Sequence, residues 1–201
     1  MDTKSFFVAV SVCTLSGQVI AGEFFFSQAE YEASVSIIDS NGFDDVIPGT
    51  QSAYSYTFGD YAYSISSLDT GGSGLSNGDG YVQLAGGNES MLISFTGAPV
   101  TAFSANLWAT DDTGNPGAGA YIIITISNGD SIIQSSTSQE NFFSYISDTA
   151  FDSIQVSYSA GSPQMPTYAA IDNLGIAQAI PAPGAATALG MMIVGITRRR
   201  R

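Results

Sequence analysis

The chain has 201 residues, of which 18 are acidic, 5 are basic and none is histidine, so its formal net charge is −13. All the basic residues lie at the two ends, and residues 5–197 hold seventeen acidic side chains without one cation. This pattern excludes nucleic acid and other polyanions as partners, since no cation can displace phosphate counterions, and it leaves no histidine base or cationic clamp for the usual catalytic triad or phosphate site.

Residues 1–22 are typical of a secretory signal peptide. Lys4 supplies the cationic start, the apolar run SFFVAVSVCTL follows, and small residues lead to a cleavage position between Ala21 and Gly22. The alternative interpretation is a buried first strand, since FFVAVSVC is also rich in β-forming residues. Cys13, the sole cysteine, lies inside this segment. We therefore expect a mature chain without a disulfide, a thiolate metal site or a cysteine nucleophile.

Short β-rich runs separated by Gly, Ser, Asn and Asp turns predict an all-β body. Asn128-Gly129 predicts a hairpin, because Asn-Gly suits the positive φ angles of a tight β-turn. No helical period occurs outside the two ends, and TGGSGLSNGDG at 70–80 is expected to be a long flexible loop. The expected strands are residues 33–39, 53–58, 61–67, 81–85, 91–96, 101–110, 120–127, 131–138, 142–147, 151–159 and 168–177.

So many short strands in one domain need a way to hide their edges, which predicts a two-sheet, jelly-roll-like β-sandwich over residues 23–179. The body carries no cation to pair with its acidic side chains. Its stability must therefore come from an apolar core and from the hydrogen bonds between strands.

Acidic loops suggest a site for calcium, a hard cation that prefers oxygen ligands. One candidate set is Asp111, Asp112 and Asn115, to which Asp172 could add a ligand. A second run, IDSNGFDD at 38–45, offers further carboxylates. Neither run has the spacing of an EF-hand loop, and the alternative interpretation is that both are solvated acidic loops.

Three aromatic residues could form a platform on which a sugar ring stacks. Tyr61 and Tyr63 are two residues apart and so share one strand face, while Trp108 is the only tryptophan. In the run TAFSANLWAT, alternation places Trp108 on the more polar face, opposite Phe103 and Leu107, which hints at exposure. The alternative interpretation is burial, because aromatic side chains dominate cores.

A glycan hydrolase or lyase that works with carboxylates alone is a further alternative. Such chemistry needs two carboxyl groups facing each other across a cleft. Asp and Glu are available in the body, but no pair carries a recognisable catalytic signature. We therefore expect no catalytic residue.

The C-terminal segment, residues 180–201, joins an apolar run to Arg198, Arg199, Arg200 and Arg201. As a helix, residues 185–197 would rise ~20 Å, which is short against a bilayer core of ~30 Å unless the arginines snorkel. Four consecutive arginines resist translocation and should remain cytoplasmic. The segment is thus expected to be a short transmembrane helix; the alternative is a terminal core helix.

This tail resembles a PEP-CTERM sorting signal, which is found in exported proteins of many Gram-negative bacteria. The resemblance rests on a Pro-x-Pro element, a short apolar span rich in Ala, Gly and Leu, and the terminal arginine cluster. The element is Pro181-Ala182-Pro183 here, where the family usually has Glu in the middle. The resemblance implies recognition by an exosortase, a membrane cysteine transpeptidase, with cleavage near this tripeptide.

Residues 91–177 look like the extracellular β-sandwich commonly attached to such tails. That resemblance implies a fold similar to carbohydrate-binding modules and no catalytic residue. We expect an exported, non-catalytic protein of the cell surface or extracellular matrix, structural or adhesive and associated with exopolysaccharide, that touches the membrane only through its tail. The alternatives are a carbohydrate-binding module, with or without structural calcium, and the hydrolase or lyase above.

Overall fold

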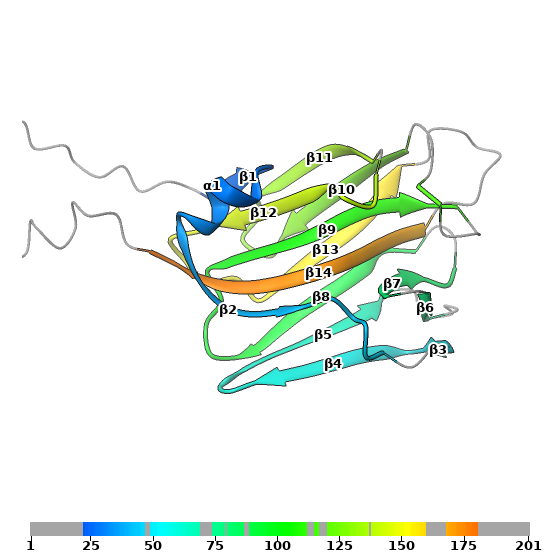
Figure 1. Ribbon diagram of the computed structural model, residues 1–201, viewed down its shortest axis with the longest axis horizontal. Helices are drawn as coiled ribbons and strands as arrows, with labels where there is room; N and C mark the ends of the chain where they lie inside the picture. Colours follow the sequence, from blue (N-terminus) through cyan, green and yellow to red (C-terminus); the bar gives the residue numbers. More distant parts are fainter. Residues whose placement is uncertain are drawn as a thin grey trace, which may run out of the picture. The chain divides into compact units, whose positions relative to one another are not determined.

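Two antiparallel β-sheets lie face to face in the computed structural model of the chain (Figure 1), which confirms the predicted all-β sandwich. The structure describes residues 22–46, 49–68, 74–78, 80–86, 89–111, 115–116, 120–136, 138–159 and 168–180. The predicted signal peptide up to Ala21, the Pro181-Ala182-Pro183 element and the arginine cluster lie outside these ranges. No helix within them is both long enough and apolar enough to span a bilayer.

Within the described residues the larger sheet has eight strands, and its central strand, β14, is the last of them in the sequence. Its order is β1-β12-β9-β14-β7-β6-β3, and β2 also pairs with β14. On one edge β14 pairs with β9; on the other it pairs first with β7 and then with β2. The strands are β1 (Glu23–Phe25), β2 (Val35–Asn41), β3 (Gly49–Gln51), β6 (Leu75–Gly78), β7 (Tyr81–Leu84), β9 (Ala102–Thr110), β12 (Phe142–Ile146) and β14 (Tyr168–Ala179).

The smaller sheet has six strands in the order β11-β10-β13-β8-β5-β4. All of its pairings are antiparallel. The Asn128-Gly129 hairpin is confirmed: it joins β10 to β11, and Gly129 adopts φ 101° while Asn128 keeps a negative φ. The strands are β4 (Ala53–Phe58), β5 (Tyr61–Ser67), β8 (Met91–Gly97), β10 (Ala120–Ile126), β11 (Ser131–Ser136) and β13 (Ser153–Ser159).

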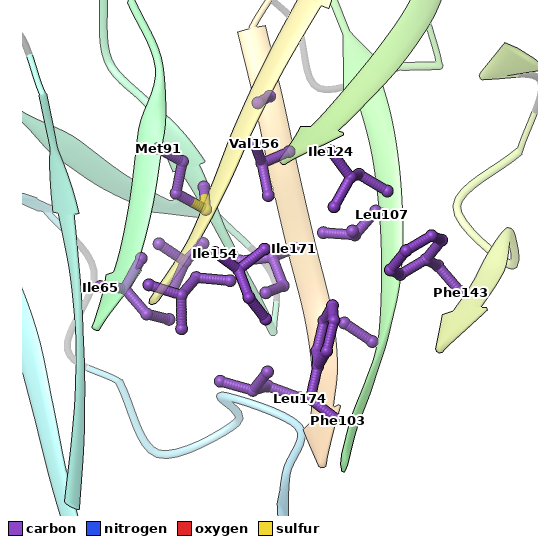
Figure 2. Close-up of a cluster of buried hydrophobic side chains, with 14 of the residues drawn as sticks. Ile65, Met91, Phe103, Leu107, Ile124, Phe143, Ile154, Val156, Ile171 and Leu174 are labelled. Atoms are coloured by element: carbon purple, nitrogen blue, oxygen red, sulfur yellow. The ribbon is translucent and has the colours of Figure 1, made fainter. Parts of the chain in front are cut away.

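Apolar side chains from the inner faces of both sheets form the main core. Strand alternation places Phe103 and Leu107 of β9 on the inner face, where they meet Ile154 and Val156 of β13. Figure 2 shows these side chains interdigitating with those of Ile171 on β14. The core thus supplies the stability that ion pairs cannot supply in a body without cations.

Four elements were not predicted. They are β1, β3, β6 and the five-residue helix α1 (Gln28–Glu32). Strand β6 lies inside the segment expected to be a flexible loop, and that expectation was wrong because Leu75 is fully buried in the core. Strands of only three or four residues show too few alternating positions to stand out in a sequence.

Helix α1 also corrects the expectation of no helix in the body. A single turn is too short to show a 3.6-residue period, but its start carries a recognisable signal. Ser27 is the N-cap, its Oγ accepts a hydrogen bond from the backbone N–H of Glu30 at 3.5 Å, and Ser27-x-x-Glu30 matches the capping-box pattern. The helix contacts β1, β2 and β12 at one end of the larger sheet (Figure 1).

Candidate binding groove

A groove of about 330 Å³ runs beside α1 on the outer face of the larger sheet, the face turned away from the main core. We call it the helix groove. Side chains from α1, β2, β9, β12 and β14 line it, so segments far apart in the sequence build one site. Its lining residues are Gln28, Tyr31, Glu32, Ile37, Ser40, Ser104, Asn106, Phe142, Asn173 and Gly175.

The floor of the helix groove is a row of small residues that the strand register brings side by side. Gly175 of β14 pairs with Ser40 of β2 on one edge and with Ser104 of β9 on the other. A Cβ on Gly175 would lie 2.7 Å from Ser104 Oγ, closer than a real Cβ approaches such an atom. The Ser104 hydroxyl therefore takes up space that a side chain at position 175 would need.

The wall of the helix groove is held by a second, smaller apolar cluster on the same outer face. Tyr31 packs there with Val35, Ala102 and Ala177. Its ring lies 6.0 Å, centroid to centroid, from that of Phe142, which also lines the groove. Tyr31 thus anchors a helix that is too short to be stable alone.

The Tyr31 hydroxyl is buried and completes no hydrogen bond within the structure. Burial raises the pKa of Tyr31 well above its usual range, and the nearby Ser104 side chain opposes that rise without completing a hydrogen bond. An unpartnered buried polar group costs ~1–3 kcal/mol. This end of the groove therefore holds a polar atom that a hydrogen-bonding guest would stabilise.

The rim on the helix side carries the only carboxylate among the residues that line the groove. Gln28 Nε2 donates a hydrogen bond to Glu32 Oε1 at 2.7 Å, and both side chains are exposed. A glycoside hydrolase needs two carboxyl groups on opposite sides of its substrate. With one carboxylate in its lining, the helix groove does not have that arrangement.

The opposite rim is shaped by a bulge in β14. Its register shifts between Asp172 and Gly175, and Asn173 adopts φ 49°, a left-handed conformation that Asn tolerates better than most residues. The backbone N–H of Asn173 donates to Asp172 Oδ1 at 2.6 Å. Burial raises the pKa of Asp172, the Asn173 hydrogen bond lowers it, and the Asp44 carboxylate raises it further.

The tyrosines predicted as a sugar platform face the core instead. Tyr61 and Tyr63 share a strand face, as alternation predicted, but that face is the inner one. Tyr63 is 3% exposed and stacks on Tyr56 with ring centroids 5.1 Å apart, while Tyr61 is partly buried against the same core. Alternation shows which residues share a face; it does not show which face meets the second sheet.

Trp108 lies on the outer face of β9, opposite Phe103 and Leu107, as predicted, but it is 1% exposed. The hint of exposure was wrong and the interpretation as a buried aromatic is confirmed. Its ring meets that of Tyr81 edge to face, with centroids 5.2 Å apart. Trp108 is not among the groove-lining residues.

The residues predicted as calcium ligands do not come together as one set. The Asn115 backbone N–H donates to Asp111 Oδ1 at 3.0 Å, which closes that loop on itself, and Asp112 lies outside the described ranges. Asp172 pairs with Asn106, five residues before Asp111, a separation of roughly 16 Å along an extended strand. Within the described ranges, no group of three or more acidic, cysteine or histidine side chains is placed to hold a metal ion.

Asp172 instead lies beside residues of the second acidic run. The carboxylates of Asp44 and Asp172 and the side-chain oxygen of Asn173 lie 3.4–3.9 Å from where a Cβ on Gly42 would stand. This places acidic side chains from distant segments within reach of one another. The sequence contained both segments but gave no sign that they would meet.

No family model and no curated protein matches the chain. Among solved structures, it is similar to the CBM22-1 xylan-binding domain of Xyn10C from Paenibacillus barcinonensis. That likeness has a TM-score of 0.35 and 14% sequence identity, and it covers 74% of this chain and 98% of the other. A likeness this distant does not indicate a shared ligand.

Proposed function

We propose that the chain is an exported, non-catalytic protein of the cell surface or extracellular matrix, with a structural or adhesive role. The two ends support export: Lys4 precedes one apolar run, and the arginine cluster follows the other. The PEP-CTERM-like tail makes the chain a substrate of an exosortase, held briefly at the inner membrane before processing. The body is then a jelly-roll-like sandwich outside the cytoplasm.

The helix groove is the observation that carries the adhesive part of this proposal. It is a concave site lined by amides, hydroxyls and aromatic rings. Such a mixture is typical of sites that bind small molecules. The lining offers neither a nucleophile with an adjacent base nor a facing pair of carboxylates.

Export and processing are tested by the intact mass of the protein recovered from its native host. We expect a mass that lacks residues 1–21 and that ends near Pro181-Ala182-Pro183. A variant with all four terminal arginines changed to glutamine should keep the first cleavage and lose the second. Recovery of the full-length chain from the cytosol, with Met1 and Arg201 both present, would contradict the proposal.

Carbohydrate binding, with or without structural calcium, is the second candidate function, and the helix groove favours it. Polysaccharide pull-down with Asn106→Ala, a change in the groove floor, tests this function directly. Gln155→Ala is the matched control, because Gln155 is an exposed amide on β13 of the other sheet. Equal retention of both variants on every polysaccharide would count against the groove as the contact site.

A further inference from the structure

We infer that the helix groove binds a short segment of a neutral saccharide and discriminates against acidic polysaccharides. This inference rests on the adhesive function proposed above and assigns its ligand class. It is carried by three properties of the lining residues: their charge, their hydrogen-bonding groups and their apolar surface.

Charge excludes acidic sugars from the groove. Glu32 is the only ionisable carboxylate in the lining, and residues 5–197 contain no lysine, arginine or histidine to offset it. A uronate held ~4 Å from Glu32 would be repelled by it, and this repulsion is stronger near a protein surface than in bulk water. A neutral sugar meets no such penalty.

The polar groups of the groove suit a ligand that both donates and accepts hydrogen bonds. Gln28, Asn106 and Asn173 offer amides, while Ser40 and Ser104 offer hydroxyls. Within the described ranges, Asn106 makes no side-chain hydrogen bond, so its amide is available to a guest. Sugar hydroxyls can satisfy donors and acceptors alike, whereas a cation could use only the oxygens of this lining.

Apolar surface in the same groove suits the C–H faces of a sugar ring. Phe142, which packs on the buried ring of Tyr31, forms one wall, and Ile37 is 52% exposed on the β2 side. Aromatic rings combined with a few fixed polar groups are typical of small-molecule sites. The volume of about 330 Å³ is near the lower end for such sites, so the groove holds a short segment of chain.

The Tyr31 hydroxyl gives the inference a specific test residue. It is a buried polar atom that makes no hydrogen bond with the residues that the structure describes, and it lies near Ser104 in the groove floor. Tyr31→Phe keeps the ring that anchors α1 and removes only this hydroxyl. A loss of saccharide affinity without a loss of stability would therefore report a hydrogen bond made to the ligand.

The test is isothermal titration of the full chain with cellohexaose, xylohexaose and an oligogalacturonate. We expect at least one neutral hexasaccharide to bind more tightly than the oligogalacturonate, and Asn106→Ala to weaken that binding about 10-fold or more. Gln155→Ala should leave it unchanged. Glu32→Gln should narrow the preference for the neutral sugar by strengthening binding of the oligogalacturonate.

Three outcomes would overturn the inference: no binding of either neutral hexasaccharide, tighter binding of the oligogalacturonate, or neutral binding that Asn106→Ala leaves intact. None of these would affect export or tail cleavage, which intact mass measures separately. Asn106→Ala could abolish retention of the protein in the host matrix while neutral sugars fail to bind. That result would support the adhesive function and contradict a neutral saccharide as the ligand.

Discussion

Gly175 of β14 lies opposite Ser104 of β9, so close that a Cβ on the glycine would stand 2.7 Å from the serine Oγ. Both residues line the floor of the helix groove. Its depth therefore depends on a residue without a side chain, at a position where the backbone φ does not itself require glycine.

Gly175→Ala should make the groove shallower and displace the Ser104 side chain. Because a hydroxyl can rotate away and alanine restricts the unfolded chain, we expect a change in unfolding free energy of about 1 kcal/mol or less. The loss in binding free energy for the saccharide should exceed the loss in unfolding free energy. The double variant with Gly175→Ala and Ser104→Ala removes the close contact, so its Tm should return to that of the unchanged protein. A Tm that stays low would show that the Ser104 hydroxyl is not the cause of the destabilisation.

Tyr31→Ala should cost about 3–5 kcal/mol of unfolding free energy, because it removes a fully buried ring that holds α1 on the sheet. Tyr31→Phe should be neutral or stabilising, since it deletes a buried hydroxyl without a hydrogen bond. Urea unfolding of both variants checks the pair. Equal destabilisation by the two substitutions would show that the hydroxyl has a partner in solution.

Asp172→Asn should raise the Tm at pH 7 and flatten its dependence on pH. The pKa of Asp172 is raised in the folded state, by burial first and also by Asp44, so its ionised form opposes folding above that pKa. As the pH falls through the raised pKa toward the ordinary value, the folded state takes up the proton first and gains stability. Asparagine keeps the acceptor for the Asn173 N–H. Thermal unfolding of both proteins across a range of pH checks this. An equal dependence of the Tm on pH in the variant and the unchanged protein would contradict it.

Trp108 should fluoresce as a buried indole, with blue-shifted emission and weak quenching by acrylamide, and saccharide should not change the signal. Trp108 is the only tryptophan, so the emission reports this position alone. Trp108→Ala should cost about 3–5 kcal/mol. Strong quenching, or a spectral shift on adding a sugar that binds, would show that Trp108 is exposed or contacts the ligand.

Alternation and turn residues were enough to predict the sandwich, the Asn128-Gly129 hairpin and the shared face of Tyr61 and Tyr63. They could not predict which face of a strand meets the other sheet, because a period of two residues is the same from either side. The platform of tyrosines failed for that reason. Burial of Trp108 on the outer face depends on neighbours that come from other segments, such as Tyr81.

The helix groove itself could not be predicted from the sequence. Its floor needs Ser40, Ser104 and Gly175 in register, and these residues belong to strands that are far apart along the chain. None of them forms part of a local motif. Its wall could have been found, since Ser27-x-x-Glu30 signals the start of a helix even where one turn shows no period.

The central place of β14 in the larger sheet has a consequence for the timing of folding. This strand ends at Ala179, yet β9, β7 and β2 all take hydrogen bonds from it. Until β14 is available, those three earlier strands lack their shared neighbour, and pairing across such sequence separations slows folding. The larger sheet can therefore be completed only after β14 has been made, later than the three strands that pair with it.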